Sequence, residues 1–225
     1  MSQSEQRPAR RREALSAAGI VRVAIEILDA EGEDALTFRS LAERLSTGAG
    51  AIYHHVANKD ELLEAAAESL VSGVASTPES LVPSDESVRA LMLEVFDLID
   101  AHRWLGSQLA RAPWQAAVLL VFEAVGDRLV IRGVSERHRF DVASALLQYV
   151  LGAAGQYAAS LRIPTAVGRS EFLKTVTGDW TSRAGPEELP FVHSMARQLA
   201  DHDDRRQFAA GVDLILAGAA ANPRT

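Results

Sequence analysis

The sequence contains no cysteine among its 225 residues. Disulfide scaffolds, thiolate metal sites and a thiol nucleophile are therefore excluded, and the composition fits a reducing compartment. The sequence also lacks any apolar run approaching the roughly 20 residues that span a bilayer. No apolar segment follows the basic residues near the N-terminus, which argues against a secretion signal. These absences predict a cytoplasmic protein with no membrane partner.

Positive charge is also scarce, because 23 Lys and Arg residues face 30 Asp and Glu residues and the formal net charge is −7. This total disfavours a nucleic-acid partner, but binding depends on where the charges lie. The basic residues of the N-terminus are Arg7, Arg10, Arg11 and Arg12. We interpret residues 1–13 as a flexible basic arm. It either contacts phosphates or a minor groove, or it is a solvated tail.

The two-residue alternation of a β-strand is missing, whereas apolar residues recur every three or four positions along most of the chain. This pattern predicts an all-α fold with about nine or ten helices. Gly32 and Gly133 are expected ends of helices, Thr37 is the expected cap of the helix after Gly32, and Asn58 is the expected cap of a long helix. The segment STPESLVPSD, residues 76–85, is the clearest break in the chain. Residues 163–190 are rich in proline and glycine, which predicts a long, partly irregular connection.

The most informative stretch is TFRSLAERLSTGAGAIYHHVANK, residues 37–59. Its first half has an apolar helical stripe of Phe38, Leu41, Ala42 and Leu45. Residues 46–48 interrupt the stripe, and Ile52 and Val56 resume it. Two short helices joined by a glycine-containing turn, with polar groups on the second, make a helix-turn-helix. An ordinary helical hairpin in an all-α core would show the same spacing.

The run LAERLSTGAGAIYHHVANKDELL, residues 41–63, resembles the DNA-binding domain of the TetR family of transcriptional regulators. The similar positions are Leu41–Ala42, Ile52–Tyr53, His55–Val56, Asn58–Lys59 and Leu62–Leu63. The segment FAAGVDLILAG, residues 208–218, is similar in character to the last helix of many members. The resemblance implies a helix-turn-helix DNA-binding domain at residues 14–60. It also implies a helical domain for effector binding and dimerisation at residues 61–225.

The resemblance nominates a DNA-binding surface, and four of its residues are candidates to hold phosphate oxygens. These are Thr37, Tyr53, His55 and Lys59. Arg39 matches a family position that can reach a base edge, where a bidentate contact to guanine discriminates by roughly 1–3 kcal/mol. The full predicted set is Thr37, Arg39, Thr47, Gly48, Ala49, Gly50, Ala51, Tyr53, His54, His55 and Lys59.

The recognition helix departs from the family pattern. The family turn usually carries Gly and an aliphatic residue before a polar cap, whereas this chain has Ser46, Thr47 and Gly48. The helix then begins Ala-Gly-Ala, without a long polar side chain that could read a donor–acceptor pattern. We therefore expect base reading to fall on Arg39, Thr47 and His54, helped by DNA shape.

One helix-turn-helix covers few base pairs, so such proteins usually act as symmetric dimers on palindromic sites. The resemblance likewise implies a homodimer on a palindromic operator in double-stranded DNA. The helices expected at 140–161 and 205–220 contain interior glycines, each of which costs about 1 kcal/mol relative to alanine. Close approach of a second subunit, or tight packing within one subunit, would explain that cost. The predicted interface is Gly152, Gly155, Gly211, Leu214 and Gly218.

The C-terminal half should also contain an effector pocket. Its candidates are Trp104, Trp114, Phe122, Gln148, Tyr149, Gln156, Tyr157 and Trp180. Such side chains suit a planar, largely apolar small molecule, although each one alone is more often a core residue than a ligand contact. His102 and His193 have no partner at metal-ligand spacing, so we predict no metal and no cofactor.

The sequence contains no nucleotide-binding loop, metal cluster or nucleophile elbow, which argues against an enzyme. We therefore predict a transcriptional regulator, specifically a repressor that a small-molecule effector releases from its operator. The alternative is a helical adaptor without specific DNA binding. It would explain the acidic charge and the plain Ala-Gly-Ala helix.

Overall fold

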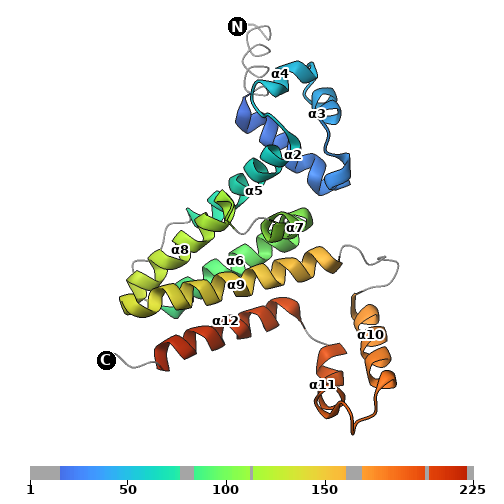
Figure 1. Cartoon of the computed structure of the whole chain (residues 1–225), viewed down its shortest axis with the longest axis vertical. Coiled ribbons are helices and arrows are strands. Elements are labelled where there is room, and N and C mark those ends of the chain that lie inside the picture. Colours follow the sequence, from blue (N-terminus) through green and yellow to red (C-terminus); the bar gives the residue numbers. More distant parts are fainter. Residues whose placement is uncertain (1–15, 77–83, 112–113, 161–168, 201–202, 222–225) are drawn as a thin grey trace, which may run out of the picture.

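The structure is a computed structural model, and it describes residues 16–76, 84–111, 114–160, 169–200 and 203–221 (Figure 1). The elements are α2 (Ala17–Glu31), η1 (Glu33–Ala35), α3 (Phe38–Arg44), α4 (Ala49–Tyr53), α5 (Lys59–Ala75), α6 (Asp85–Ala101), α7 (Arg103–Arg111), α8 (Ala116–Arg132), α9 (Glu136–Ser160), α10 (Arg169–Arg183), α11 (Pro190–Ala200) and α12 (Asp204–Ala221). Over these ranges the structure has eleven α-helices and one short 3-10 helix, which confirms the all-α prediction. The predicted arm at residues 1–13 lies outside the described residues.

The predicted helix ends are confirmed at atomic detail. Asn58 caps α5, with the Glu61 N–H donating to its side-chain oxygen at 2.8 Å. Gly32 ends α2 and Gly133 ends α8, each with φ of 83°. That backbone region favours glycine because a Cβ atom would crowd the main chain.

Helix α5 runs from the helix-turn-helix into the larger helical body (Figure 1). It packs against α2 on the side of the helix-turn-helix and against α6 and α8 in the larger helical body. The buried apolar residues form one continuous cluster that includes α2, α5, α8, α9 and α12. The division at residue 60 stays a prediction, since α5 begins at Lys59 and contributes to both sides.

Helix α7 lies close to α9 because one position has no side chain. A Cβ atom on Gly106 would stand 2.7 Å from the main-chain oxygen of Ala154. The same helix contacts α2 and α5, so it touches both the helix-turn-helix end and the body. Helix α7 is thus held on two sides.

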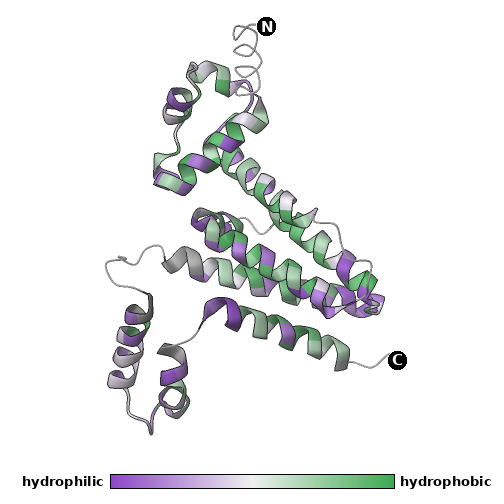
Figure 2. Ribbon diagram, turned by 180° about the vertical axis from the view of Figure 1, so that it is seen from behind, coloured by the Kyte–Doolittle hydropathy of each residue, from purple (hydrophilic) through white to green (hydrophobic). Residues whose placement is uncertain are grey.

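The predicted irregular connection at residues 163–190 is wrong over 169–183, where α10 forms. The helix has little apolar periodicity beyond Leu173, Val176 and Trp180, and Gly178 interrupts it, so the sequence signal was weak. Helices α10 and α11 pack mainly against each other and stand away from the body (Figure 1). Figure 2 shows that α10 is more hydrophilic than α5, α8 and α9.

None of the helices in the described ranges is long and apolar enough to cross a membrane.

Candidate nucleic-acid interface

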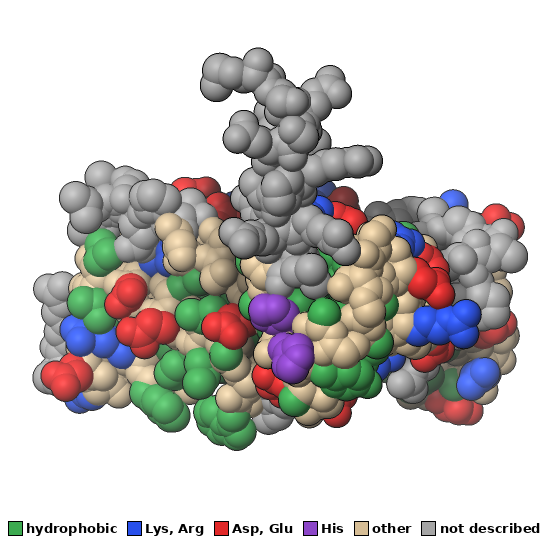
Figure 3. Space-filling model, turned by 90° about the horizontal axis from the view of Figure 1, so that it is seen from above, with side chains coloured by type: hydrophobic (Ala, Val, Ile, Leu, Met, Phe, Trp, Pro, Cys, Tyr) green, Lys and Arg blue, Asp and Glu red, His purple; other side chains and the backbone are tan. Residues whose placement is uncertain are grey.

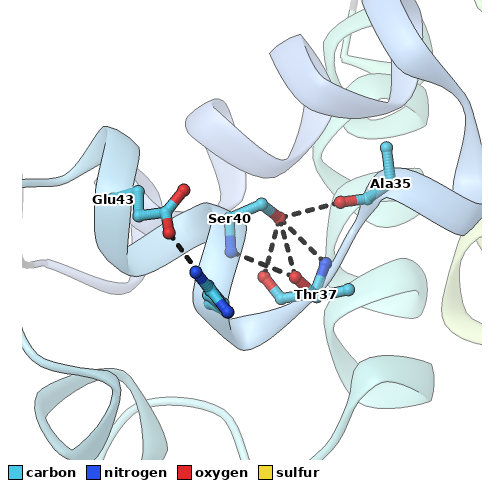
Figure 4. Close-up of polar contacts among 5 residues, drawn as sticks. Ala35, Thr37, Ser40 and Glu43 are labelled. Carbon is cyan, nitrogen blue, oxygen red and sulfur yellow. Dashed lines mark hydrogen bonds and ion pairs between the residues drawn. The ribbon is translucent and has the colours of Figure 1, made fainter.

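The start of α3 is fixed by a reciprocal pair of hydrogen bonds (Figure 4). The Ser40 N–H donates to Thr37 Oγ1, and the Thr37 N–H donates to Ser40 Oγ, both at 3.0 Å. The Ser40 hydroxyl also lies 2.8 Å from the Ala35 carbonyl, which it reaches as a donor. This arrangement is a capping box, and it confirms Thr37 as the N-cap of α3. It also fixes η1 against the first turn of α3.

The turn between α3 and α4 closes by two main-chain bonds. The Ser46 N–H donates to the Glu43 carbonyl, and the Thr47 N–H donates to the Ala42 carbonyl at 3.0 Å. This is a Schellman motif, in which glycine usually occupies the left-handed position. Here Ser46 occupies it, with φ of 52°. The turn departs from the family pattern at a position where the backbone itself favours glycine.

A ring stack ties the recognition helix α4 to α3. Phe38 and Tyr53 have ring centroids 4.2 Å apart and planes 6° from parallel. Tyr53 is nevertheless 55% exposed, so one face of its ring packs while the rest remains open to solvent. The stack orients Tyr53 without burying it.

The side chain of Lys59 is held by a main-chain oxygen of the preceding 3-10 helix. Its Nζ donates to the Glu33 main-chain oxygen at 2.6 Å. Across the described residues of α2 to α5, Arg22, Arg39 and Arg44 each form an ion pair with a carboxylate, whereas Lys59 forms none. An ammonium group has three N–H donors, so two remain for another partner.

Three of the four predicted phosphate contacts meet at one groove. The groove has a volume of about 340 Å³ and is lined by Leu36, Thr37, Phe38, Leu41, Tyr53, Lys59 and Leu62. Thr37, Tyr53 and Lys59 reach it from α3, α4 and α5 respectively. His55, the fourth residue, is exposed just past α4 and does not line the groove.

The predicted base-reading residues are exposed to different degrees. The Arg39 side chain is 89% exposed and forms an ion pair with Glu43 at 3.0 Å (Figure 4). Gly48, Gly50 and His54 are exposed, while Thr47, Ala49 and Ala51 are half-buried. Figure 3 shows histidine side chains near the centre of the face seen from this end of the molecule.

The predicted effector residues differ in exposure and packing. Gln148, Gln156 and Trp180 are exposed, and Trp114 is 80% exposed. Phe122 packs edge-on against Phe140, and Tyr149 stacks on Phe208 at 4.9 Å. Burial raises the pKa of the Tyr149 hydroxyl above its ordinary value. The side chain of Tyr157 lies outside the described residues.

Trp104 is buried, but its polar group is already engaged. Its indole Nε1 donates to Asp29 Oδ1 at 2.8 Å, across the contact between α7 and α2. This hydrogen bond therefore connects the helical body to the helix-turn-helix end.

Two buried glutamine side chains were not predicted from the sequence. Gln108 and Gln115 are both buried, and Gln108 Nε2 donates to Gln115 Oε1 at 3.2 Å. Gln115 Nε2 in turn donates to the Gln108 main-chain oxygen at 2.7 Å. The side-chain oxygen of Gln108 has no hydrogen-bond partner among the described residues. The available signal was a glutamine between Leu105 and Leu109 on the apolar face of α7.

The predicted dimer residues divide into two kinds. A Cβ atom on Gly211 would stand 2.1 Å from the Tyr149 hydroxyl oxygen, so this glycine makes room for packing within the subunit. Gly152 and Gly218 are exposed, with open space where a Cβ atom would lie, and Leu214 is 75% exposed. Gly155 is half-buried, also with open space at its Cβ position.

In the part of the chain that the structure describes, no group of three or more His, Asp or Glu side chains is placed to hold a metal ion.

The helical fold and the helix-turn-helix surface define a DNA-binding regulator. A family model described as bacterial regulatory proteins, tetR family, matches residues 20–66. The chain is 43% identical to the transcriptional regulator SCO7222, a TetR from Streptomyces coelicolor. That match covers 92% of this chain and 98% of the other, with a TM-score of 0.77. This protein therefore belongs to the TetR family.

Two further relatives are similar over most of their length. ActR from Streptomyces coelicolor, in complex with actinorhodin, is 26% identical, with 92% of this chain and 95% of that chain covered and a TM-score of 0.72. An HTH-type transcriptional regulator of Saccharopolyspora erythraea is 28% identical over 207 residues, which are 90% of this chain and 83% of the relative. The protein is a DNA-binding transcriptional regulator rather than an enzyme, and the adaptor alternative is not supported.

Replacing Ser46 by glycine should stabilise the protein. A residue with a Cβ atom in the left-handed region costs about 1 kcal/mol or more, and replacing it by glycine removes this cost. Part of the stability gained is lost again, because glycine has more conformational freedom in the unfolded state. We expect Ser46→Gly to raise the free energy of unfolding by about 0.5 kcal/mol, measured by denaturant unfolding. The matched control is Ser69→Gly on the exposed face of α5, where glycine should destabilise the helix. Equal destabilisation by both changes would contradict the strain at Ser46.

Proposed function

We propose that the protein is a repressor, which binds a palindromic operator as a homodimer and is released by a small-molecule effector. The observation that carries the DNA-binding role is the groove at which Thr37, Tyr53 and Lys59 meet. Three polar side chains from three helices converge on one exposed surface. Hydroxyl and ammonium groups in such an array suit the phosphate oxygens of a DNA strand.

Lys59 and the helix N-terminus favour a phosphate, although Asp60 and Glu61 add two carboxylates to the same turn. Lys59 lies in the first turn of α5, where the helix dipole also favours negative charge. Asn58 caps one N–H of this turn and the Ala57 N–H donates to Glu61, so the chain entering the helix is fixed. Lys59 therefore presents its free donors from a defined backbone position.

To contact a base, Arg39 would give up only its ion pair with Glu43. Its ion pair with Glu43 is exposed, and exposed pairs of this kind contribute about 0–1 kcal/mol. A bidentate contact to guanine discriminates by roughly 1–3 kcal/mol, so exchanging Glu43 for guanine is favourable. The exposed Gly50 lets the backbone of α4 approach the bases closely, and Ala49 and Ala51 suit thymine methyl groups. His55 is a further phosphate donor beyond the groove.

Footprinting on the DNA upstream of the gene, followed by binding assays on operator variants, tests these roles. Lys59→Ala should weaken binding to all variants alike and lower the slope of log affinity against log salt by about one. Arg39→Ala should instead relax the preference among variants, with a loss of about 1–3 kcal/mol confined to the best site. Equal effects of both changes on every variant would remove the assignment of Arg39.

The exposed side of α9 and α12 supports the homodimer. Leu214, Gly218 and Gly152 present an apolar and small-residue surface that a second subunit can approach closely. Helices α9 and α12 also pack on each other within the subunit, so they form one continuous face. Two copies of such a face would make a four-helix interface with two-fold symmetry.

A charge at Leu214 should separate the subunits. Leu214→Glu places a carboxylate in the proposed interface, and sedimentation at micromolar concentration should show a shift from dimer to monomer. Leu119→Glu, on the exposed side of α8, is the control and should leave the dimer intact. A wild-type monomer under these conditions would contradict the proposed interface.

Effector binding is assigned to the helical body. The relative ActR forms a complex with actinorhodin, a small molecule, which supports the same role here. Gln108 offers an acceptor from a mostly apolar environment, so a planar, largely apolar effector with one N–H or O–H donor would match it. Release of DNA then follows if the effector binds better to a form that fits the operator poorly.

Ligand binding and DNA release should appear together. Actinorhodin is the first probe, followed by a panel of planar polycyclic compounds. A compound that binds the folded state adds about 2.7 kcal/mol to the free energy of unfolding when its free concentration is a hundred times its Kd. This added stability raises the melting temperature. The same compound should abolish the footprint. Compounds that raise the melting temperature but leave the footprint unchanged would contradict effector-controlled release.

A further inference from the structure

Two acidic residues on the DNA-binding side hold α7 of the body. Asp29 accepts from Trp104 Nε1 at 2.8 Å, and His102 Nδ1 lies 2.8 Å from the same oxygen. Further along, Arg111 Nη2 lies 3.0 and 2.9 Å from the two carboxylate oxygens of Glu33. Contacts at both ends of α7 therefore meet the end of α2 and the 3-10 helix that follows it.

Glu33 differs from Asp29 because it makes a second contact, through its main chain. Its carbonyl oxygen accepts the bond from Lys59 Nζ at 2.6 Å. The residue belongs to η1, a single short turn between Gly32 and Leu36. In so short an element, anchoring the Glu33 side chain to Arg111 limits how far the turn, and with it the Glu33 carbonyl, can shift. Glu33 therefore links Arg111, which its carboxylate contacts, to Lys59, which its carbonyl contacts.

We propose that Glu33 is a positioning residue for DNA binding, which orients Lys59 through its carbonyl and is itself held by Arg111 of α7. This inference rests on the proposed phosphate contact of Lys59. A lysine has a flexible four-carbon stem, and a bond to a fixed carbonyl limits the orientations that it must give up on binding. Arg111 does not line the groove, yet through Glu33 it would set the position of the group that meets the phosphate.

Positioning and simple charge effects have opposite signs at Glu33. Replacing Glu33 by glutamine removes a negative charge close to the proposed phosphate site. By charge alone, this should strengthen DNA binding. If Glu33 positions Lys59, the weaker hold of Arg111 on a neutral amide should weaken binding instead. The sign of the change therefore separates the two explanations.

The test measures affinity for the footprinted duplex with the full-length protein. Glu33→Gln and Arg111→Gln should each lower the affinity about 3- to 10-fold, and the double variant should lose no more than either single change. The control is Asp97→Asn, which removes one carboxylate from a similarly exposed ion pair with Arg205, between α6 and α12. It should leave the affinity unchanged, and its melting temperature shows how much of any loss reflects stability. Unchanged or increased affinity of Glu33→Gln overturns the proposal.

A Lys59→Ala background separates this inference from the proposed function. If Lys59→Ala alone leaves DNA affinity and its salt dependence unchanged, the phosphate role of Lys59 is wrong. If Lys59→Ala weakens binding, adding Glu33→Gln should cause no further loss, because the oriented group is gone and only the smaller favourable effect of removing a negative charge remains. A further loss in that background would show that Glu33 acts by another route, and would overturn its assignment as the positioning residue for Lys59.

Discussion

Burial of one face of α5 is the constraint on which the arrangement depends. Leu62, Leu63, Ala66, Ala67 and Val71 are all buried, and a fully buried leucine contributes roughly 1.5–3 kcal/mol. These residues belong to a helix that packs on α2 and also on α6 and α8. The N-terminus of α5 carries Lys59, the proposed phosphate contact. A change in the body that tilts this helix must therefore move the DNA-binding end as well.

The recognition helix depends on its neighbours more than on its own sequence. It has five residues and no side-chain cap, and a helix of that length is not stable alone in water. Burial of Ile52 and the stack of Tyr53 on Phe38 hold it in place. The Ala-Gly-Ala start, of which only Gly50 is exposed, therefore needs to add little stability, because Ile52 and Tyr53 supply it.

Local features of the DNA-binding end could be predicted from the sequence, because caps and apolar stripes act within a few residues. Thr37, Asn58 and Gly32 have the predicted roles at helix ends. Contacts between distant segments gave no such signal, because Glu33 and Lys59 are 26 positions apart and Asp29 and Trp104 are 75 apart. The effector candidates were chosen by residue type, and type does not specify which side chains converge. Helix α10 was missed because its faces differ little in polarity.

The acidic composition is compatible with DNA binding because the charges of this unit are locally paired. Arg22, Arg39 and Arg44 each lie beside a carboxylate, which leaves Lys59 as the cation of the described α2–α5 segment without an ion pair. We expect a surface with few unpaired cations to release few counterions, so that each placed contact has a larger share of the binding free energy. A shift of a few kcal/mol is then enough to exchange bound for free protein. Sparse charge therefore makes the affinity sensitive to how α7 and η1 place one lysine.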